Sequence, residues 1–437
     1  MVARLHRRGF GRNVLVLAGG AAGAQAINAA ASPLLTRFYS PFEIGQLGLF
    51  LSFMYVASVA LSLRYEQALV VPKTVEDAAT LAVLAIAIVP LTALFSTVVL
   101  FALGVLRLAG FETLPPIAWL AALVGLSAFG IFGVLRYWLI RLSQLRTVSE
   151  VQIAQSLGRA AGQVLFGIAS LGVTGLLVSD TIGRGLGVLR MLRLAIPTIR
   201  EGRSRSVRSI TALAREYWRF PVLGVPSSLL NAVAFSLPVP LLAAGYTLQV
   251  AGYFALVQRV LGLPLTIIGA SVSDALFARM SEHAQHDPAA ALPLFRRTAL
   301  ALAAIGIPIA LVVALFARPL FTTIFGQPWE TAGLMAAIMS PWYLAALVVS
   351  PLSRVALVYQ GQAGKLVYDV VSLVGVVASL VGGAALGFDA LGAVSALAAL
   401  QIVAYGVYFV VLYRLVTRAS PGRSDPGATA GEPGPVS

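Results

Sequence analysis

Three arginines lie within apolar stretches of the sequence, where an unpaired cation is costly. Arg159 occurs in LGRAAGQ, Arg184 in SDTIGRG and Arg259 in YFALVQRVLGLP. An arginine at the centre of a membrane-spanning helix costs about 2.5 kcal/mol on insertion scales. A guanidinium stays charged, and its fork of N–H groups matches the geometry of phosphate oxygens. These positions therefore favour an anion site, in which the cations meet a doubly charged phosphate group.

Asp180 gives one of these arginines a second explanation. It lies four residues before Arg184 on the same helical face, so a purely structural ion pair is the alternative there. Arg159 and Arg259 have no acidic residue one helical turn away, and pairing is less favoured for them. Because few acidic residues fall within the apolar stretches, Asp180 is also the best candidate for coupling to H⁺ or Na⁺.

Two GxxxG spacings surround the same arginines, Gly158 with Gly162 and Gly183 with Gly187. Such spacing usually allows helices to pack closely, which is the interpretation we prefer. GRGLG at 183–187 is not a dinucleotide-binding fingerprint, since its spacing is wrong and no strand precedes it. The sequence has no cysteine, which excludes thiolate metal sites, and we expect no metal or other cofactor.

Two further features concern movement. Pro264 lies five residues beyond Arg259, and a proline in a spanning helix loosens the backbone bonding. We therefore choose Pro264 as a hinge, with a static kink as the alternative. Arg64 and Glu66 fall in an expected inner loop, where they form either a gate or merely an ion pair.

The elements that position these residues are expected to be membrane-spanning helices. Of the 437 residues, 59% are hydrophobic and 11% are charged, whereas a soluble domain carries roughly 25% charged residues. A span needs about 20 mostly apolar residues. The sequence thus predicts an all-α polytopic membrane protein with twelve transmembrane helices. The predicted spans are 14–36, 42–63, 79–106, 115–139, 148–170, 173–194, 221–244, 249–273, 293–316, 332–353, 366–386 and 390–412.

The basic residues orient these spans. With a cytoplasmic N-terminus, 25 of the 31 basic residues fall in cytoplasmic segments and three fall in outer loops. This is a strong positive-inside bias, and it predicts that both termini are cytoplasmic. The formal charge of +14 then reflects orientation beside anionic membrane lipids, and we expect no nucleic-acid partner.

An internal similarity divides the chain into two parts. PLLTRFYSPFEIGQLGLF from Pro33 aligns without gaps to PLLAAGYTLQVAGYFALV from Pro240, with six identities. We expect two six-helix bundles around a central cavity, an architecture that suits alternating access. The predicted divisions are a cytoplasmic N-terminus (1–13), an N-terminal bundle (14–194), a basic cytoplasmic linker (195–219), a C-terminal bundle (220–414) and a disordered cytoplasmic tail (415–437).

The three arginines fall at similar depths in this arrangement. Arg159 and Arg184 each lie about twelve residues from the outer turn near 171–175, or roughly 18 Å below it at about 1.5 Å per residue. That depth is near the middle of a ~30 Å hydrocarbon core. Arg259 lies at a similar depth in the other bundle. The sequence therefore predicts that cations from both bundles face one central cavity.

Several stretches resemble bacterial polysaccharide-exporting flippases of the O-antigen type, in the multidrug/oligosaccharidyl-lipid/polysaccharide (MOP) exporter superfamily. They are RFYSPFEIGQLGLFLSFMYVASVALSLRYEQALVVPK (37–73), FPVLGVPSSLLNAVAFSLPVPLLAAGY (220–246), VAGYFALVQRVLGLPLTIIGASVSDALFARMSE (250–282), IFGQPWETAG (324–333) and PWYLAALVVSPLSRV (341–355). The resemblance implies two six-helix lobes around a cationic cavity. It also implies an undecaprenyl-diphosphate-linked oligosaccharide as cargo, moved across the bacterial inner membrane to the outer leaflet. A polysaccharide polymerase and a chain-length regulator are partners that the resemblance leaves open.

Two other functions remain as alternatives. A cation or drug antiporter of the same fold predicts acidic residues at the midplane, the reverse of three arginines against one aspartate. A polysaccharide polymerase or ligase needs an external loop with a catalytic arginine or histidine, and the expected outer loops are short. We therefore expect a transporter and not an enzyme.

Overall fold

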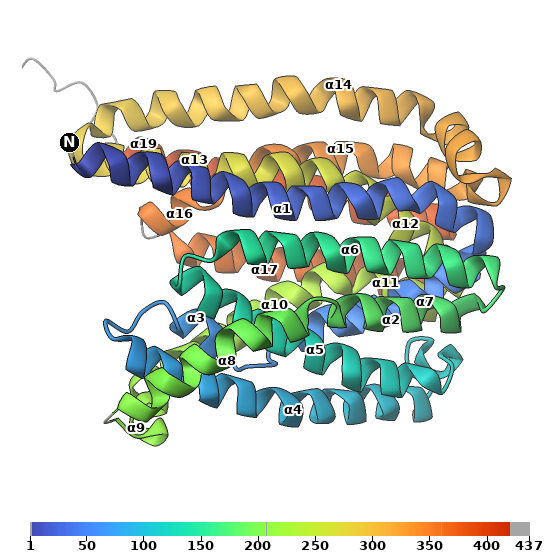
Figure 1. The fold of residues 1–437 in the computed structure, drawn as a ribbon. Coiled ribbons are helices and arrows are strands. Elements are labelled where there is room, and N and C mark those ends of the chain that lie inside the picture. Colours follow the sequence, from blue (N-terminus) through green and yellow to red (C-terminus); the bar gives the residue numbers. More distant parts are fainter. Residues whose placement is uncertain (1, 207, 360, 420–437) are drawn as a thin grey trace, which may run out of the picture.

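The computed structural model describes residues 2–206, 208–359 and 361–419, and Figure 1 shows them as a bundle of long helices that run roughly parallel. Within these residues all regular structure is helical and no strand occurs. The predicted all-α class is thereby confirmed. The predicted tail falls mostly at 420–437, outside the described residues.

The first half of the chain forms mainly regular α-helices. Their bounds are α1 (Val2–Phe38), α2 (Pro41–Ser58), α3 (Tyr65–Ala68), α4 (Val75–Val105), η1 (Phe111–Thr113), α5 (Ile117–Arg141), α6 (Leu145–Ile168), α7 (Gly172–Gly185), α8 (Val188–Arg205) and α9 (Ile210–Glu216). Figure 1 shows the start of α1 together with α3, α8 and α9 at one end of the bundle. We call this the basic end, since α8 alone carries five arginines, at 190, 193, 200, 203 and 205.

The second half contains several interrupted helices. Its elements are η2 (Phe220–Gly224), α10 (Val225–Ser236), α11 (Pro238–Gly245), α12 (Leu248–Pro264), η3 (Leu265–Gly269), α13 (Ala270–His286), η4 (Pro288–Ala290), α14 (Ala291–Phe325), η5 (Gln327–Trp329), α15 (Glu330–Leu352), α16 (Val355–Val358), α17 (Gln362–Val377), η6 (Ala378–Gly382), α18 (Gly383–Ala385) and α19 (Ala390–Ala419). Three of these segments, η2, η3 and η6, are π-helical and continue directly into α-helices.

Helical structure overlaps each of the twelve predicted spans. By length and hydropathy, seven helices of the described chain could each cross a membrane, and the bent pair Phe220–Ser236 and Pro238–Gly245 adds an eighth. The protein is thus a multi-pass helical membrane protein. Length and hydropathy identify fewer spans than the twelve predicted. Among the predicted spans that this criterion leaves out is the sixth, since α7 has only 14 residues.

The sixth predicted span is broken in the structure. Helix α7 ends at Gly185, and Gly187 takes a left-handed backbone with φ 75°, which glycine adopts without steric cost. Helix α8 then runs to Arg205, and α9 follows it. The predicted linker at 195–219 is therefore largely helical, because its apolar positions Ala195, Ile199 and Leu213 are buried against the first half.

Buried apolar side chains hold the two halves together. The largest cluster contains fully buried Phe50 of α2 and Phe254 of α12, so it crosses from one half to the other. A second cluster, around Trp138, lies within the first half, and a third, around Phe295, lies within the second half. The helices α2 and α12 therefore form the main apolar junction between the halves.

The internal repeat has the same local structure in both copies. Ser40 precedes α2 and its Oγ accepts the backbone N–H of Glu43 at 3.3 Å. The aligned Thr247 precedes α12 and its Oγ1 accepts the backbone N–H of Val250 at 3.2 Å. A hydroxyl side chain at this position satisfies a backbone donor that the helix leaves free. The Ser-to-Thr match in the sequence thus corresponds to two equivalent helix caps.

The two copies also contact each other through their aligned glycines. A Cβ added to Gly252 would lie 2.9 Å from the backbone N of Gly45, and one added to Gly45 would lie 3.0 Å from the carbonyl carbon of Leu248. Pro41, which aligns with Leu248, in turn faces Gly252. The contact is reciprocal, as expected for two units related by an approximate two-fold axis. It lies near the starts of α2 and α12, at the end of the bundle away from the basic end (Figure 1).

Candidate functional site

A cavity of about 530 Å³ lies between the two halves. Its walls come from α1, α2, α5, α6 and α7 of the first half and from α10, α11 and α12 of the second. The three arginines selected from the sequence, Arg159, Arg184 and Arg259, all line it, and so does Asp180. These residues come from three different helices, so the cavity exists only when both halves are packed together.

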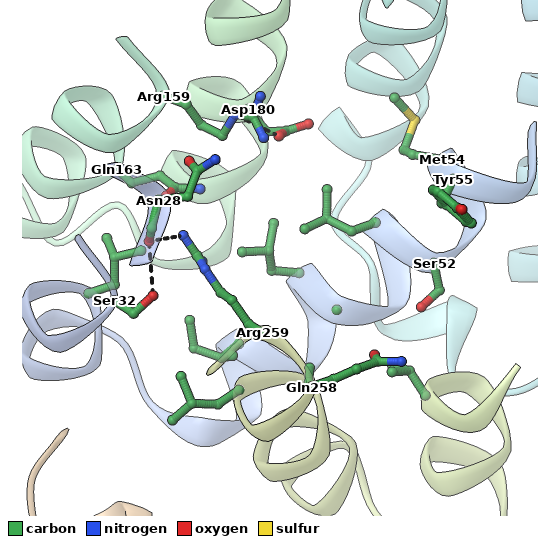
Figure 2. Close-up of a pocket in the computed structure, with 18 of the residues that line it drawn as sticks. Asn28, Ser32, Ser52, Met54, Tyr55, Arg159, Gln163, Asp180, Gln258 and Arg259 are labelled. Atoms are coloured by element: carbon green, nitrogen blue, oxygen red, sulfur yellow. Dashed lines mark hydrogen bonds and ion pairs between the residues drawn. The ribbon is translucent and has the colours of Figure 1, made fainter. Parts of the chain in front are cut away.

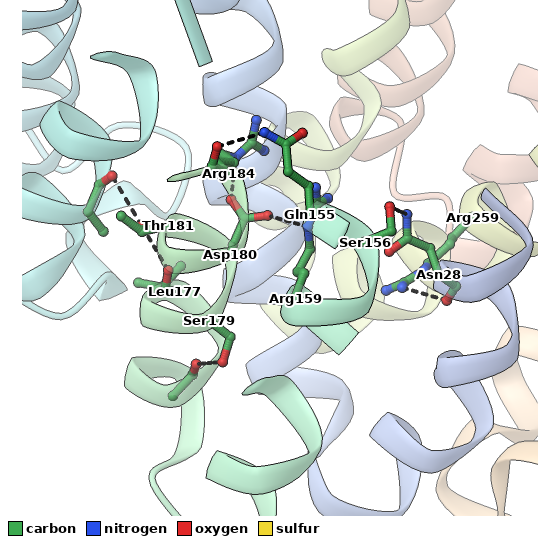
Figure 3. Close-up of polar contacts among 12 residues, drawn as sticks. Asn28, Gln155, Ser156, Arg159, Leu177, Ser179, Asp180, Thr181, Arg184 and Arg259 are labelled. Carbon is green, nitrogen blue, oxygen red and sulfur yellow. Dashed lines mark hydrogen bonds and ion pairs between the residues drawn. The ribbon is translucent and has the colours of Figure 1, made fainter. Parts of the chain in front are cut away.

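Asp180 contacts both arginines of the first half. Arg184 Nε donates to Asp180 Oδ2 at 2.6 Å, and Arg159 Nε lies 3.5 Å from Oδ1 (Figure 3). The aspartate side chain is 1% exposed, whereas those of Arg159 and Arg184 are 24% and 13% exposed. The carboxylate therefore lies behind the guanidinium groups and leaves part of each one facing the cavity.

The partner of Arg159 differs from the expectation. No acidic residue lies one turn away on its own helix, but Asp180 reaches it from the adjacent helix α7. Arg184 makes the pair expected from its spacing, and its guanidinium carbon also lies 5.3 Å from the centroid of the Phe129 ring. An aromatic face at this distance further stabilises a cation.

Small residues permit the close approach of α6 and α7. A Cβ added to Gly183 would lie 2.8 Å from Arg159 Cβ, and one added to Gly162 would lie 3.1 Å from Ser179 Cβ. Both distances are shorter than ordinary van der Waals contacts, so larger side chains would force the helices apart. The close packing predicted from the GxxxG spacings is present, and it brings Arg159 within reach of Asp180.

Arg259 is held in a different way. Its Nη2 donates to the backbone carbonyl oxygen of Asn28 at 2.7 Å, and Ser32 Oγ donates to the same oxygen at 3.0 Å (Figure 2). The Asn28 side chain in turn donates to Ser156 Oγ at 3.4 Å, which connects α1 to α6 (Figure 3). Over the described residues, no carboxylate forms an ion pair with Arg259.

The charged residues of the cavity do not balance. Among the described residues that line it, three are arginines and one is an aspartate, and no other is charged. The lining therefore carries a net charge of two positive units. An unbalanced positive charge inside a membrane protein is stabilised when an anion enters, because water there is restricted and the fixed cations face the space.

Asn28, whose backbone carbonyl oxygen accepts a hydrogen bond from Arg259, was not predicted from the sequence. A signal was present, since Gln25, Asn28 and Ser32 are polar residues three and four positions apart in an otherwise apolar helix. Such spacing puts them on one helical face. All three line the cavity. Polar residues at helical spacing within a predicted span therefore mark the cavity-facing side of α1.

The remaining residues selected from the sequence lie outside the set that lines the cavity. Arg64 precedes α3 with a left-handed backbone, φ 64°, and its Cγ lies 3.7 Å from a Cβ position built on Gly224 of the second half. Glu66 accepts a hydrogen bond from Ser62 Oγ and makes no ion pair with Arg64 in this structure. Pro264 ends α12 and directly precedes the π-helical segment η3.

Within the described residues, no group of three or more histidine, cysteine, aspartate or glutamate side chains is close enough together to hold a metal ion.

A known protein family matches most of the chain. A family model described as polysaccharide biosynthesis protein matches residues 34–333, well over half of the chain. The chain belongs to this family. The match includes the four charged residues of the cavity. No curated protein of this family, or of any other, is matched by sequence.

Solved structures similar to this member of the family are MOP-superfamily transporters. An inward-facing multidrug resistance MATE transporter superimposes with a TM-score of 0.69 at 13% identity, over 90% of this chain and 95% of that one. The lipid II flippase MurJ in an inward closed conformation gives 0.66 at 11% identity, over 93% and 90%. A MOP transporter from Pyrococcus furiosus gives 0.57 at 14%, over 94% and 96%. The protein therefore has the MOP transporter fold.

Proposed function

We propose that this protein is a flippase for an undecaprenyl-diphosphate-linked oligosaccharide. It moves this carrier from the cytoplasmic to the outer leaflet of the bacterial inner membrane, for assembly of an O-antigen, capsule or exopolysaccharide. The observation that carries the proposal is the set of three arginines and one aspartate on a cavity between the two halves. Membership of a polysaccharide biosynthesis family supports the same cargo.

The charge of the cavity fits the linkage of this cargo. A diphosphate that joins a lipid to a sugar carries two negative charges, equal and opposite to the net charge of the lining. Each guanidinium has five N–H donors, and Asp180 faces only the Nε of Arg159 and of Arg184. The terminal nitrogens remain available for phosphate oxygens. A cation antiporter requires the opposite charge, which makes that alternative less favourable.

Orientation and coupling belong to the same proposal. The positive-inside bias puts the basic end and both termini in the cytoplasm. In that orientation, the close contact of α2 with α12 at Gly45 and Gly252 lies toward the outer side of the membrane. Coupling to H⁺ or Na⁺ is assigned to Asp180, because a cation bound there would cancel the charge that holds Arg159 and Arg184.

Leaflet exchange in liposomes tests this function directly. The purified protein is reconstituted with undecaprenyl diphosphate that carries a labelled sugar, and transfer between leaflets is followed. Arg159→Gln, Arg184→Gln and Arg259→Gln should each slow transfer by about tenfold to a hundredfold, the loss of one charged hydrogen bond. Substitutions at Arg64 and Glu66, our candidate gate, should change the rate of transfer between leaflets but not the affinity for the lipid.

A matched arginine serves as the control. Arg318 pairs with Glu330 on the surface and does not line the cavity, so Arg318→Gln should transport at the normal rate. Folded variants of all three cavity arginines that also transport normally would show that the anion site is wrong. For the coupling, Asp180→Asn should make transport insensitive to an imposed H⁺ or Na⁺ gradient, and unchanged sensitivity would remove Asp180 from that role.

A further inference from the structure

The cavity has a second side whose chemistry differs from that of the arginines. Polar and aromatic residues line it there beside the apolar side chain of Met54, and none of them is charged. The polar and aromatic ones are Ser52, Tyr55, Phe235 and Gln258. Figure 2 shows Ser52 and Tyr55 across the cavity from Arg159, Asp180 and Asn28. An anion site and a neutral site therefore share one space.

Successive residues of α12 connect the two sides. Arg259 extends toward Asn28, whereas Gln258 points toward the side where Ser52 lies (Figure 2). Neighbouring residues of a helix point in different directions, so the two side chains reach opposite sides of the cavity. A diphosphate held by Arg259 would therefore have its sugar directed across the cavity, toward the side of Gln258.

Two aromatic rings form the wall of the neutral side. The ring centroids of Tyr55 and Phe235 lie 5.5 Å apart with an interplanar angle of 56°. The two residues are 47% and 57% exposed, so their rings are not covered by neighbouring side chains. Tyr55 belongs to α2 and Phe235 to α10, so the pair is formed by both halves. Gln258 Nε2 donates to the Phe235 carbonyl oxygen at 3.3 Å, which holds the amide beside the rings.

We propose that Tyr55, Phe235 and Gln258 bind the first sugar of the lipid-linked oligosaccharide and select an uncharged one. This inference rests on the proposed function, since the arginines must hold the diphosphate for the sugar to reach these rings. A sugar ring presents apolar C–H groups on its face and hydroxyl groups at its edge. The face suits an exposed aromatic ring, and the edge suits an amide and hydroxyl side chains.

Selection against an acidic sugar follows from the same lining. A carboxylate on the first sugar would lie among Tyr55, Phe235 and Gln258, none of which is a cation; Arg64, whose charge acts on Tyr55, does not line the cavity. Burying an unpaired charge is costly. Because the two rings come from different halves, movement of the halves would also separate them and release the sugar.

Binding measurements with three lipids test the sugar site. The probes are undecaprenyl diphosphate alone, the same lipid with one N-acetylglucosamine, and the same lipid with one glucuronic acid. The protein in detergent should bind the N-acetylglucosamine lipid about tenfold more tightly than the sugar-free lipid, a gain typical of aromatic contact. Tyr55→Ala and Phe235→Ala should abolish this gain and leave the affinity for the sugar-free lipid unchanged. Tyr55→Phe, which keeps the ring, should retain most of it.

Two controls separate this inference from the proposed function. Arg259→Gln should weaken binding of the sugar-free and N-acetylglucosamine lipids by the same factor. Phe316→Ala removes an aromatic side chain that is 54% exposed on α14 and does not line the cavity, so it should change neither affinity. If Tyr55→Ala weakens both lipids equally, or if the glucuronic acid lipid binds as tightly as the N-acetylglucosamine lipid, the sugar site is wrong while the flippase stands. If no lipid binds in an arginine-dependent way, both proposals fail.

Discussion

The two halves hold their cavity arginines by different means. In the first half, Arg159 and Arg184 share the buried carboxylate of Asp180, and glycines pack their helices closely. In the second half, Arg259 is held by a backbone carbonyl oxygen of α1. A shared buried carboxylate fixes two cations in place, whereas a single carbonyl contact is readily exchanged for a phosphate oxygen. The first half is therefore the fixed part of the proposed anion site, and Arg259 is its adjustable part.

The helices of the second half are also less regular than those of the first. All three π-helical segments of the described chain, η2, η3 and η6, lie in the second half. Pro264 follows the repeat glycine Gly252 by twelve residues, and Ala57 follows Gly45 by the same interval. Helix α2 ends one residue later, at Ser58, whereas α12 continues through η3 into α13. Because π-helical turns are weak points that occur often at functional sites, the second half is the better candidate for the deforming partner.

The largest expected effect is on the fixed part. Asp180→Ala leaves two largely buried guanidinium groups without their carboxylate, and it should lower the free energy of unfolding by about 3 kcal/mol. Chemical unfolding in detergent measures this change. Asp274→Ala removes an aspartate from an exposed pair with Arg354 and should cost less than about 1 kcal/mol. Equal losses in the two variants would contradict a structural role for the shared carboxylate.

The second prediction separates stability from transport. Arg259→Gln should slow leaflet exchange by at least about tenfold and lower the free energy of unfolding by only about 1 kcal/mol, since one hydrogen bond to a carbonyl is lost. Arg184→Gln should reduce both quantities, because it also leaves Asp180 with a weaker partner. If Arg259→Gln unfolds as easily as Arg184→Gln, the distinction between fixed and adjustable arginines is wrong.

The smallest effect concerns the hinge. Pro264→Ala restores a backbone donor next to η3 and should stiffen the α12–α13 connection, so that transport slows several-fold while lipid affinity stays the same. Rates in liposomes and equilibrium binding in detergent distinguish the two effects. Pro90→Ala, at a proline inside α4 of the first half, is the control and should leave the rate unchanged. A normal rate for Pro264→Ala would identify this proline as a static kink.

Much of the helical organisation could be predicted from sequence because hydropathy reports directly on membrane burial. Each predicted span overlaps helical structure, and the all-α class is confirmed. The depth argument selected Arg159, Arg184 and Arg259, and these three line one cavity in the structure. Such success rests on a local property, since an arginine in an apolar helix is visible without knowledge of its neighbours.

The contacts between helices could not be predicted in the same way. Spacing within one helix identified the pair of Arg184 with Asp180, but the contact of Arg159 with Asp180 depends on how α6 and α7 are rotated against each other. The polar spacing of α1 marks the face on which Asn28 lies, but the sequence does not show that its backbone carbonyl oxygen accepts a hydrogen bond from Arg259. The π-helical turns likewise depend on packing around the helix and not on a sequence motif.

The reciprocal meeting of Gly45 and Gly252 has a consequence for the origin of the chain. Each copy of the repeat offers the other the same patch, which is the geometry of a symmetric homodimer. A six-helix protein with one such patch would form a homodimer with a second copy of itself through this surface. The present chain is what duplication and fusion of that ancestor would produce, with the Asp180 carboxylate and its two arginines acquired or kept by one descendant half alone.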